Sequence, residues 1–374
     1  MKLKLGDVCE KGSSSLKQSD ILGKPGDYPI YGASGYIGNV DFYHQEKPYV
    51  AIVKDGAGIG RTTFHPAKSS VIGTMQYLLP KDNVLPKYLY YVVGHMHLEK
   101  YSSGATIPHI YFKDYKMEEF NYDSFDKQNN IVAILGRCEK VISARKRELE
   151  LLDSLIKARF VEMFGDENNP KNWNIINVED VADVQVGVVI KPSQYYTDKG
   201  NGVKAFRSLN IGEGFIKDND WVYFTEEGHK KNSKSIVKEN DLLIVRSGVP
   251  GTACVVTQKY IGYNAIDIII VHPDCKKVNP YYLCCYTNMP HGKKQINEGI
   301  GGAAQQHFNV GKYNKLRLML PPKELQDEFA AFVHQVDKSK LLSLIKLLEQ
   351  LITYLYNVFI IYRQDKGEEV ERYE

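Results

Sequence analysis

The sequence lacks the features that mark membrane proteins, secreted disulfide proteins and zinc proteins. It has no run of about eighteen apolar residues that could cross a bilayer. Its first twenty residues have no apolar core of the kind that signal peptides carry. The six cysteines form no CxxC pair, which argues against a zinc site and against a disulfide framework. We therefore expect a cytoplasmic protein that binds no metal and no membrane, with its cysteines buried as small apolar residues.

A strong charge of one sign is also missing. The formal net charge is +3 and the pI is near 8.3, whereas a nucleic-acid-binding domain is usually strongly basic. Charge is informative only locally, because the stretch from Cys275 to Lys323 contains eight lysines and arginines and a single acidic residue, Glu298. Such a stretch could face phosphate groups.

Catalytic motifs are absent as well. The sequence has neither G-x-S-x-G nor a Walker loop, and Leu320–Pro322 lacks the Asn or Asp of a methyltransferase tetrapeptide. The segment Gly56–Gly60 resembles a phosphate-binding loop, but Arg61–Phe64 has the pattern of a strand, which favours a tight hairpin. His95 and His97 could be half of a metal site, but no partner cluster of ligands is visible in the sequence. We predict no catalytic residue, and a nucleotide-binding enzyme stays the weakest alternative.

The most informative feature is an internal repeat. Gly104 recurs as Gly302, which is 198 residues further on (302 − 104 = 198). The same interval relates Ala105, His109, Tyr115 and Gln128 to Ala303, His307, Tyr313 and Gln326. Two further pairs of segments match at nearly the same interval: Ile52–Gly56 with Ile244–Gly248, and Val84–Leu89 with Val278–Leu283. The chain is therefore built twice.

Each copy ends in a long helical pattern with a heptad seam. In the first copy, Arg145 takes one position of a seam formed by Ile131, Leu135, Cys138, Ile142, Leu149, Leu152 and Ile156. In the second, we predict a phase slip around residues 337–340 and a seam formed by Phe329, Val333, Val336, Leu341, Ile345, Leu348, Ile352, Leu355 and Phe359. A helix of about 36 residues is about 55 Å long. The two apolar seams need each other, so an antiparallel pair is expected.

The predicted fold class is α+β, with two mixed α/β domains, two long antiparallel helices that form a coiled coil, and a pseudo-two-fold internal repeat. We place the boundaries at 1–125 for the first domain, 126–164 for the first helix, 165–174 for a linker, 175–322 for the second domain, 323–362 for the second helix and 363–374 for an acidic tail. Between the shared landmarks the domains differ, as Tyr28–Gly38 and Lys204–Gly212 show. The scaffold repeats, but its surface does not.

In this order, these residues resemble the specificity subunit of type I restriction-modification systems. The resemblance covers nearly the whole chain. It depends on the segment Gly104–Tyr111 with its copy from Gly302, and on Leu320–Gln326 at the entry to the second helix. The segments Tyr28–Gly38 and Arg246–Gly248 also look like parts of such a protein. The duplicated order of these motifs is more specific than any one of them.

The resemblance implies a function in DNA recognition without catalysis. Each domain would be a target-recognition domain that contacts one half-site of an asymmetric, bipartite target in double-stranded DNA. The expected partners are two modification (methyltransferase) subunits and restriction (translocase and endonuclease) subunits. No cofactor is expected on this chain, because S-adenosylmethionine would bind to the modification subunits. The helix pair would set the spacing, so that a four-residue insertion near Arg145 lengthens the spacer by about one to two base pairs.

The sequence suggests candidate residues for these contacts. Arginine suits guanine in the major groove, and asparagine suits adenine. The candidates for DNA contact are Ser34, Tyr36, Lys54 and Arg61 in the first domain and Arg207, Asn210, Arg246 and Ser247 in the second. The candidates for partner contact, on the helix face opposite the seam, are Lys140, Arg147 and Glu148. The rival hypothesis is a coiled-coil protein scaffold without sequence-specific DNA binding.

Overall fold

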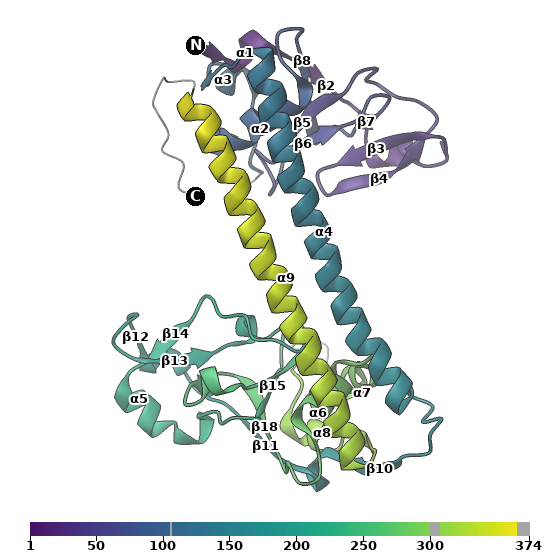
Figure 1. The fold of residues 1–374 in the computed structure, drawn as a ribbon, viewed down its shortest axis with the longest axis vertical. Coiled ribbons are helices and arrows are strands. Elements are labelled where there is room, and N and C mark those ends of the chain that lie inside the picture. The colour runs from purple at the N-terminus through teal and green to yellow at the C-terminus, as the bar shows by residue number, and fades with distance from the viewer. Residues whose placement is uncertain (105–106, 300–306, 365–374) are drawn as a thin grey trace. The chain divides into compact units, whose positions relative to one another are not determined.

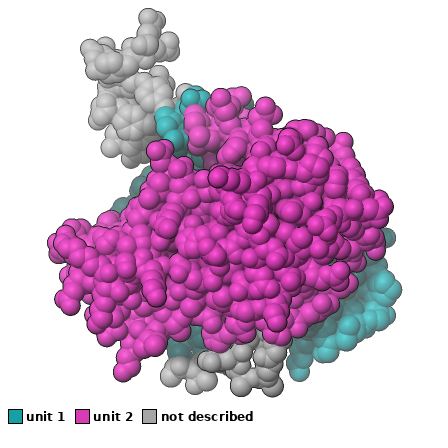
Figure 2. Space-filling view, turned by 90° about the horizontal axis from the view of Figure 1, so that it is seen from below, with its two compact units in different colours: residues 1–143, 348–374 teal, residues 144–347 magenta. Residues whose placement is uncertain are grey.

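The computed structural model describes residues 1–104, 107–299 and 307–364, with side chains described up to residue 355. The chain divides into two compact units, shown in different colours in Figure 2. Unit 1 contains residues 1–143 and 348–374, and unit 2 contains residues 144–347. Within the described residues, the helices do not combine the length and apolarity that crossing a bilayer requires. Each unit is described by itself below.

Unit 1 contains module 1, defined as residues 1–124, which has three small sheets. The largest has the order β2-β8-β5-β6, the second β4-β3-β7 and the third β1-β9. The strands are β1 (Lys2–Lys4), β2 (Cys9–Ser13), β3 (Tyr28–Gly32), β4 (Gly35–Val40), β5 (Tyr49–Val53), β6 (Thr62–His65), β7 (Ser70–Val71), β8 (Met75–Pro80) and β9 (Glu119–Asn121). The helices are α1 (Leu5–Val8), α2 (Pro86–His95) and α3 (Phe112–Tyr115).

Unit 2 contains module 2, defined as residues 165–322, which repeats this plan. Its sheets have the orders β11-β18-β15-β16, β12-β14-β13-β17 and β10-β19. The strands are β10 (Asn174–Asn177), β11 (Ala182–Val186), β12 (Tyr196–Thr197), β13 (Val203–Phe206), β14 (Val222–Phe224), β15 (Leu242–Val245), β16 (Ala253–Val255), β17 (Asn264–Ala265), β18 (Ile268–Pro273) and β19 (Arg317–Leu320). The helices are α5 (Glu226–Lys231), α6 (Pro280–Asn288), α7 (Pro290–Gly299) and α8 (Val310–Asn314).

The central strands β5 and β15 form because β-branched and apolar residues suit a strand that is covered on both faces. Every residue of both strands is buried. Successive side chains point to opposite faces, so Val50 and Ile52 pack with α2 while Ala51 and Val53 pack with β7. Strand β15 divides in the same way between two clusters. Each fully buried aliphatic side chain contributes about 1.5–3 kcal/mol.

A buried glutamine fixes the start of each long helix. Gln128 and Gln326 are both 0% exposed. The Oε1 atom of Gln128 accepts the backbone N–H of Leu85 at 2.8 Å, and the Oε1 atom of Gln326 accepts that of Asn279 at 2.8 Å. Leu85 and Asn279 directly precede the prolines that begin α2 and α6. The predicted repeat of glutamine is therefore a repeated structural contact.

Two further contacts recur in both modules. The hydroxyl of Tyr88 donates to the carbonyl of Asn121 at 3.1 Å, and that of Tyr282 donates to Met319 at 2.7 Å. The backbone N–H of residue 110 donates to Lys54 O at 3.0 Å, and that of residue 308 donates to Arg246 O at 2.9 Å. The segments that share the Gly-Ala motif thus dock on the ends of β5 and β15. Ala105, Thr106, Gly302, Ala303 and Ala304 lie outside the described residues.

The two long helices are α4 (Phe125–Phe164) and α9 (Lys323–Gln364) (Figure 1). The predicted helix boundaries, 126–164 and 323–362, differ from these by one and two residues. Each helix belongs partly to unit 1 and partly to unit 2, with the boundary after Ser143 in α4 and after Leu347 in α9. The predicted domains instead ended where the helices begin. The acidic tail at 363–374 lies almost wholly outside the described residues.

Within unit 2, the end of α4 and the start of α9 run side by side in opposite directions (Figure 1). Three contacts set the register: Glu148 with Ser343 at 3.0 Å, Asp153 with Lys340 at 2.7 Å and Arg159 with Glu328 at 2.9 Å. Because the residue number rises along α4 as it falls along α9, the pair is antiparallel. The fold is thus α+β, with a duplicated module and two long helices.

The predicted seam of α4 is confirmed, since all eight of its positions are partly shielded from solvent. The predicted seam of α9 is wrong beyond Val336. Five of its members are 44–63% exposed: Leu341, Ile345, Leu348, Ile352 and Leu355. The shielded positions are instead Lys340, Ser343, Leu347, Leu351 and Tyr354, most of which lie 198 residues after an α4 seam residue. Phe359 lies where side chains are not described. No phase slip occurs, because polar Lys340 and Ser343 contact α4.

The cysteine prediction holds in part. Cys9, Cys254 and Cys284 are buried, whereas Cys275 is exposed and Cys138 and Cys285 are partly exposed. All six are free thiols. Burial raises the pKa of the Cys9 thiol to about 12, so this residue behaves as a small apolar side chain.

Candidate nucleic-acid interface

The tip of the β3–β4 hairpin brings together three of the four candidates in module 1. Ser34 and Tyr36 lie at this turn, and Tyr36 is 62% exposed. The exposed guanidinium of Arg61 donates to the carbonyl of Ala33 in the same turn. The loop Gly56–Gly60 before Arg61 joins β5 to β6 as an antiparallel hairpin. A strand rather than a helix follows this loop, which confirms the hairpin prediction and leaves no helix N-terminus for a phosphate.

Lys54 lies at the end of β5 and belongs to a separate polar group. Its ammonium is 3.6 Å from the carboxylate of Asp55, and the other oxygen of Asp55 is 2.7 Å from Nδ1 of His109. All three side chains are about one-third exposed. His109 therefore holds the docked segment to the strand. Its counterpart His307 is exposed.

A rigid aromatic cluster supports the hairpin. The ring of Tyr31 lies 6.0 Å from Tyr36 and 4.4 Å from His65. His65 is buried, and this burial lowers its pKa to about 4. The imidazole is therefore neutral near pH 7, and the charge at this site comes from Arg61. Such preorganised support suits a surface that must present side chains in one geometry.

In module 2, Arg207 and Asn210 lie in one turn but only Arg207 reaches the surface. Arg207 bonds the backbone of Asp220 at 2.5 Å, and its side chain is 30% exposed. Asn210 is 0% exposed: its Oδ1 accepts the Arg207 N–H, and its Nδ2 donates to the carbonyl of Asn219 at 2.7 Å. An amide enclosed in this way has no free edge for a base. Asn210 fixes the turn in this structure, and its contact with DNA stays a prediction that this geometry does not favour.

Arg246 and Ser247 lie at the end of β15, as Lys54 does at the end of β5. The Arg246 guanidinium is 2.5 Å from the carboxylate of Asp267, and its Nε donates to Phe308 O at 3.1 Å. Only 16% of this side chain is exposed. Contact with a guanine would require this ion pair to break, so we assign Arg246 to loop fixation. Ser247 is partly exposed beside a cavity of module 2.

Ion pairs partly neutralise the basic stretch between Cys275 and Lys323. Lys277 pairs with Asp274, Lys294 with Glu167 and Lys323 with Asp327. The most exposed cations of its second half are Lys312, Lys315 and Arg317. Exposed pairs of this kind are worth little energetically and can be exchanged for phosphate contacts. The stretch remains a candidate for backbone contact.

The sequence reading missed an exposed apolar loop in module 2. After β11 the chain continues through Val189 and Ile190, which are 48% and 78% exposed, into Lys191 with a left-handed backbone (φ 43°). An exposed isoleucine beside a lysine suits contact with a thymine methyl and a phosphate. The available signal was an apolar run that continues beyond the end of a strand.

Of the three partner candidates on α4, two are exposed and one contacts α9. Lys140 and Arg147 are exposed. Glu148 faces α9 instead of pointing away from it, since its carboxylate accepts bonds from Arg145 at 2.6 Å and from Ser343 at 3.0 Å. The Arg145 guanidinium lowers the pKa of Glu148. Glu148 therefore lies on the side of α4 that faces α9 and not on the predicted opposite face, and its contact with a partner stays a prediction.

Both long helices also expose large apolar side chains, which were not predicted from the sequence to be at the surface. In unit 2 they include Leu151, Leu155, Leu341, Leu344 and Ile345, which are 44–60% exposed. Further along α9, Leu348, Ile352 and Leu355 are 57–63% exposed. So many large exposed apolar side chains on two helices indicate an interaction surface. Among the described residues, no three His, Cys, Asp or Glu side chains cluster closely enough to hold a metal ion.

The comparison with protein families decides the identity. A model described as the type I restriction modification DNA specificity domain matches residues 1–152 and 170–353, which is most of the chain. The chain belongs to this family. The two matched segments correspond to the two copies of the repeat. The resemblance found in the motifs is therefore confirmed.

Individual relatives are similar at low identity. The MjaIX specificity subunit of a type I restriction enzyme from Methanocaldococcus jannaschii is 21% identical over 280 residues, covering 68% of this chain and 63% of that protein. The MjaVIII specificity subunit from the same organism is 21% identical over 311 residues, covering 77% of this chain and 72% of that protein. The match to the first relative thus spans less than two thirds of its length.

Solved structures share the fold. The S subunit of a type I restriction-modification system from M. genitalium has a TM-score of 0.61 at 15% identity, covering 95% of this chain and 93% of that chain. A chain from a structural study of complex assembly and conformational transition in the type I R-M system has a TM-score of 0.50 at 14% identity, with 95% of each chain covered.

Proposed function

We propose that this chain is the DNA-specificity subunit of a type I restriction-modification complex and that each module recognises one half-site of a bipartite target. The observation that carries the proposal is a scaffold repeated contact by contact while the exposed side chains differ. Module 1 presents Tyr36 on the β3–β4 hairpin, with Arg61 of the β5–β6 hairpin beside it. Module 2 presents Ile190 and Lys191 on the loop after β11. Unlike surfaces on like scaffolds recognise unlike sequences, so the target is asymmetric.

The partners follow from the family and from the surface of the helices. Specificity subunits are non-catalytic, so adenine methylation and DNA cleavage belong to two methyltransferase subunits and to restriction subunits. S-adenosylmethionine would bind to the methyltransferase subunits. The apolar residues of unit 2 from Leu151 to Ile345 would pack against helices of these partners, and Lys140 and Arg147 would add charge at the edge. A complex that acts on cellular DNA is placed in the cytoplasm.

A protein scaffold without DNA recognition is the alternative, and the exposed apolar residues of α9 are compatible with it. The two proposals differ in what happens on DNA. A scaffold would bind its partners equally well in the presence of any DNA sequence. A specificity subunit changes its affinity when single bases of the target change.

Arg61 provides the test at residue level. In the complex with its methyltransferase subunits, Arg61→Ala is expected to weaken binding of the cognate DNA by about 1–3 kcal/mol, or roughly 5- to 150-fold, and to relax one base position. The reason is that guanidinium groups bond a guanine in two places, and alanine cannot. Fluorescence anisotropy over a series of singly substituted target duplexes measures both effects.

Arg61→Lys is the matched control, since it keeps the charge and loses the paired geometry. It should recover part of the affinity while the base preference stays relaxed. An Arg61→Ala protein that discriminates all positions as the parent does would show that Arg61 contacts no base. Uniform weakening over every duplex would assign Arg61 to phosphate.

A further inference from the structure

Unit 2 contains a cavity of about 620 Å³ between module 2 and the helix pair. One wall comes from the helices, through Ile156 on α4 and Val333 and Asp337 on α9. The opposite wall comes from the loop Leu209–Phe215 and from α6. All the lining residues lie between positions 153 and 340, so the cavity belongs to unit 2 alone. Its volume falls in the range of about 300–1,000 Å³ that is typical of small-molecule sites.

The repeat shows what fills the same place in module 1. Helices α2 and α6 correspond through Pro86 with Pro280 and through Tyr88 with Tyr282, so Tyr90 and Tyr91 correspond to Cys284 and Cys285. Phe64 lies opposite Val50 in β6, just as Val255 lies opposite Leu242 in β16. Module 1 thus has three aromatic rings where module 2 has a valine and two cysteines.

These substitutions remove ring volume from the wall of the cavity in module 2, although module 1 keeps an open depression of about 710 Å³ beside its rings. The rings of Tyr90 and Tyr91 are 5.2 Å apart, and that of Phe64 is 6.3 Å from Tyr90. They leave an open depression beside them at the surface of module 1. In module 2 the three smaller side chains all line the cavity. An apolar cavity of this kind can bind an aromatic molecule. The atoms that line it have no partners on the empty side, so they gain van der Waals contacts when a ring enters.

Module 1 also supplies an ammonium group at this place. The Nζ atom of Lys87 lies 4.4 Å from the ring centre of Tyr90 and 5.0 Å from that of Phe64, and it pairs with Glu139 at 3.0 Å. In module 2, Tyr281 stands where Lys87 does, and Asp337 stands where Glu139 does (337 − 139 = 198). The carboxylate is kept while the lysine is lost.

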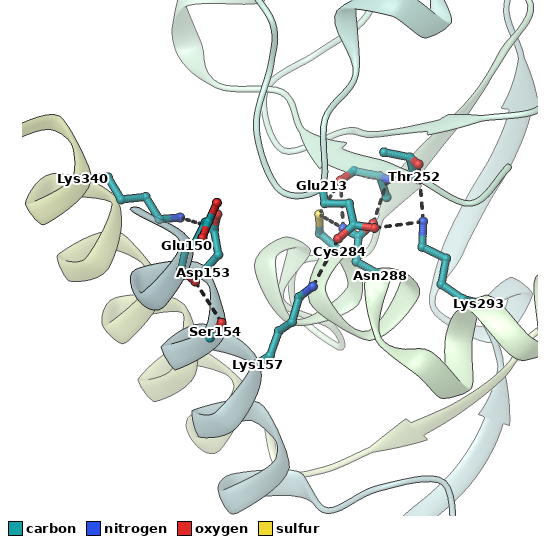
Figure 3. A network of polar contacts seen from close by, with 11 residues as sticks. Glu150, Asp153, Ser154, Lys157, Glu213, Thr252, Cys284, Asn288, Lys293 and Lys340 are labelled. Carbon is teal, nitrogen blue, oxygen red and sulfur yellow. Dashed lines mark hydrogen bonds and ion pairs between the residues drawn. The ribbon is translucent and has the colours of Figure 1, made fainter. Parts of the chain in front are cut away.

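The cavity is lined by three carboxylates and by Lys157, Lys217 and Lys340, but at the Asp337 end two carboxylates have one close ammonium between them. Asp337 and Asp153 share one ammonium, that of Lys340, at 3.1 and 2.7 Å (Figure 3 shows the bond to Asp153). Two carboxylates facing one cation leave room for a second cation at this end of the cavity. At the other end, Glu213 is held between Lys157 at 3.3 Å and Lys293 at 3.5 Å, so that carboxylate is already matched (Figure 3).

We propose that this cavity binds a small aromatic amine, with the ring against Val255, Cys284 and Cys285 and the ammonium beside Asp337 and Asp153. The ligand supplies in module 2 the ring and the cation that module 1 supplies from its own side chains. The site lies beside Ser247 and the loop Leu209–Phe215, so an occupant braces the loop that follows Arg207. The proposal does not depend on DNA recognition, and the chain alone suffices to test it.

Isothermal titration calorimetry of the full chain with 2-phenylethylamine provides the test. We expect saturable binding at one site, and binding at least tenfold weaker for n-butylamine, which lacks the ring, and for 3-phenylpropionate, which lacks the cation. Introducing the module 1 residues by Val255→Phe with Cys285→Tyr should abolish binding while the denaturation midpoint stays at or above that of the parent. Asp337→Asn should weaken binding of 2-phenylethylamine by tenfold or more.

Glu139→Gln is the matched control, because it makes the same change at the corresponding place in module 1. It should leave the affinity for 2-phenylethylamine unchanged. Equal affinity for 3-phenylpropionate would overturn the assignment of the ammonium, and unchanged binding by the filled variant would overturn the assignment of the cavity. Absence of heat at millimolar 2-phenylethylamine would refute the proposal altogether. If the filled variant does not fold, the comparison of Asp337→Asn with Glu139→Gln decides.

Discussion

Replacing Phe160 with alanine is expected to lower the free energy of unfolding of unit 2 by about 3–5 kcal/mol. Phe160 is 0% exposed near the end of α4. Its ring lies 5.5 Å from those of Tyr282 on α6 and Phe329 on α9. One side chain therefore joins the first helix, the second helix and module 2. The loss of its ring leaves a cavity that three separate elements cannot close together.

Tryptophan fluorescence during urea denaturation measures this effect selectively. The two tryptophans of the chain, Trp173 and Trp221, both lie in unit 2. The indole N–H of Trp173 donates to the carbonyl of Phe164 at 2.9 Å, so its emission reports on the end of α4 directly. Val161→Ala is the control, because Val161 is 42% exposed and should cost less than about 1 kcal/mol. Equal effects of the two substitutions would mean that Phe160 does not join these elements.

A seven-residue insertion into both long helices is expected to lengthen the spacer between the two half-sites by about three base pairs. Seven residues add about 10.5 Å of helix at 1.5 Å per residue, and DNA rises about 3.4 Å per base pair. A whole heptad keeps the seam in phase, which a four-residue insertion does not. The insertions belong after Ser143 in α4 and after Leu347 in α9, because the contact of Glu148 with Ser343 places these positions nearly opposite each other.

Mapping of methylated adenines in cells that express the variant with its methyltransferase partners gives the spacer directly. The half-sites themselves should not change, because neither module is altered. Insertion into α4 alone is the control and should abolish methylation, since it lengthens one helix of the antiparallel pair without lengthening the other. An unchanged spacer in the doubly extended variant would show that the helices do not set the distance.

The sequence predicted the parts of the fold that depend on local pattern and on repetition. The seam of α4, both helix boundaries and the hairpin at Gly56–Gly60 follow from periodicity and turn chemistry. The matched residues Gln128 and Gln326 have the same contacts, because a repeated side chain in a repeated scaffold meets the same backbone group. Repetition is thus a stronger guide to structure than any single motif in this chain.

Tertiary contacts decided the rest. The seam of α9 was mispredicted because Lys340 and Ser343 are polar, and only the opposite helix with Asp153 and Glu148 makes them suitable there. Arg246 was chosen because arginine suits guanine, and its ion pair with Asp267, which is 21 residues away, could not be identified from the sequence. The enclosure of Asn210 could not be predicted for the same reason, since its bonds are to backbone groups that only the folded turn brings close.

The exposed apolar residues of α9 show the limit of sequence-based prediction from the opposite side. Leu341, Leu344 and Ile345 fit a heptad pattern as well as true seam residues do, so the sequence placed part of this surface inside the pair. An apolar residue that faces a partner protein obeys the same periodicity as one that faces its own chain. Only the exposed fraction of each side chain in the folded structure distinguishes an outward-facing apolar residue from one that faces the other helix.

The central claim is that this chain gives a methyltransferase complex its target through two unlike modules. Sequencing that detects methylated adenine, in cells that express the methyltransferase subunits with and without this chain, tests the claim most directly. We expect one asymmetric target with two half-sites of different sequence, methylated only when this chain is present. Methylation of the same sites without the chain, or a target whose half-sites are identical, would contradict the account.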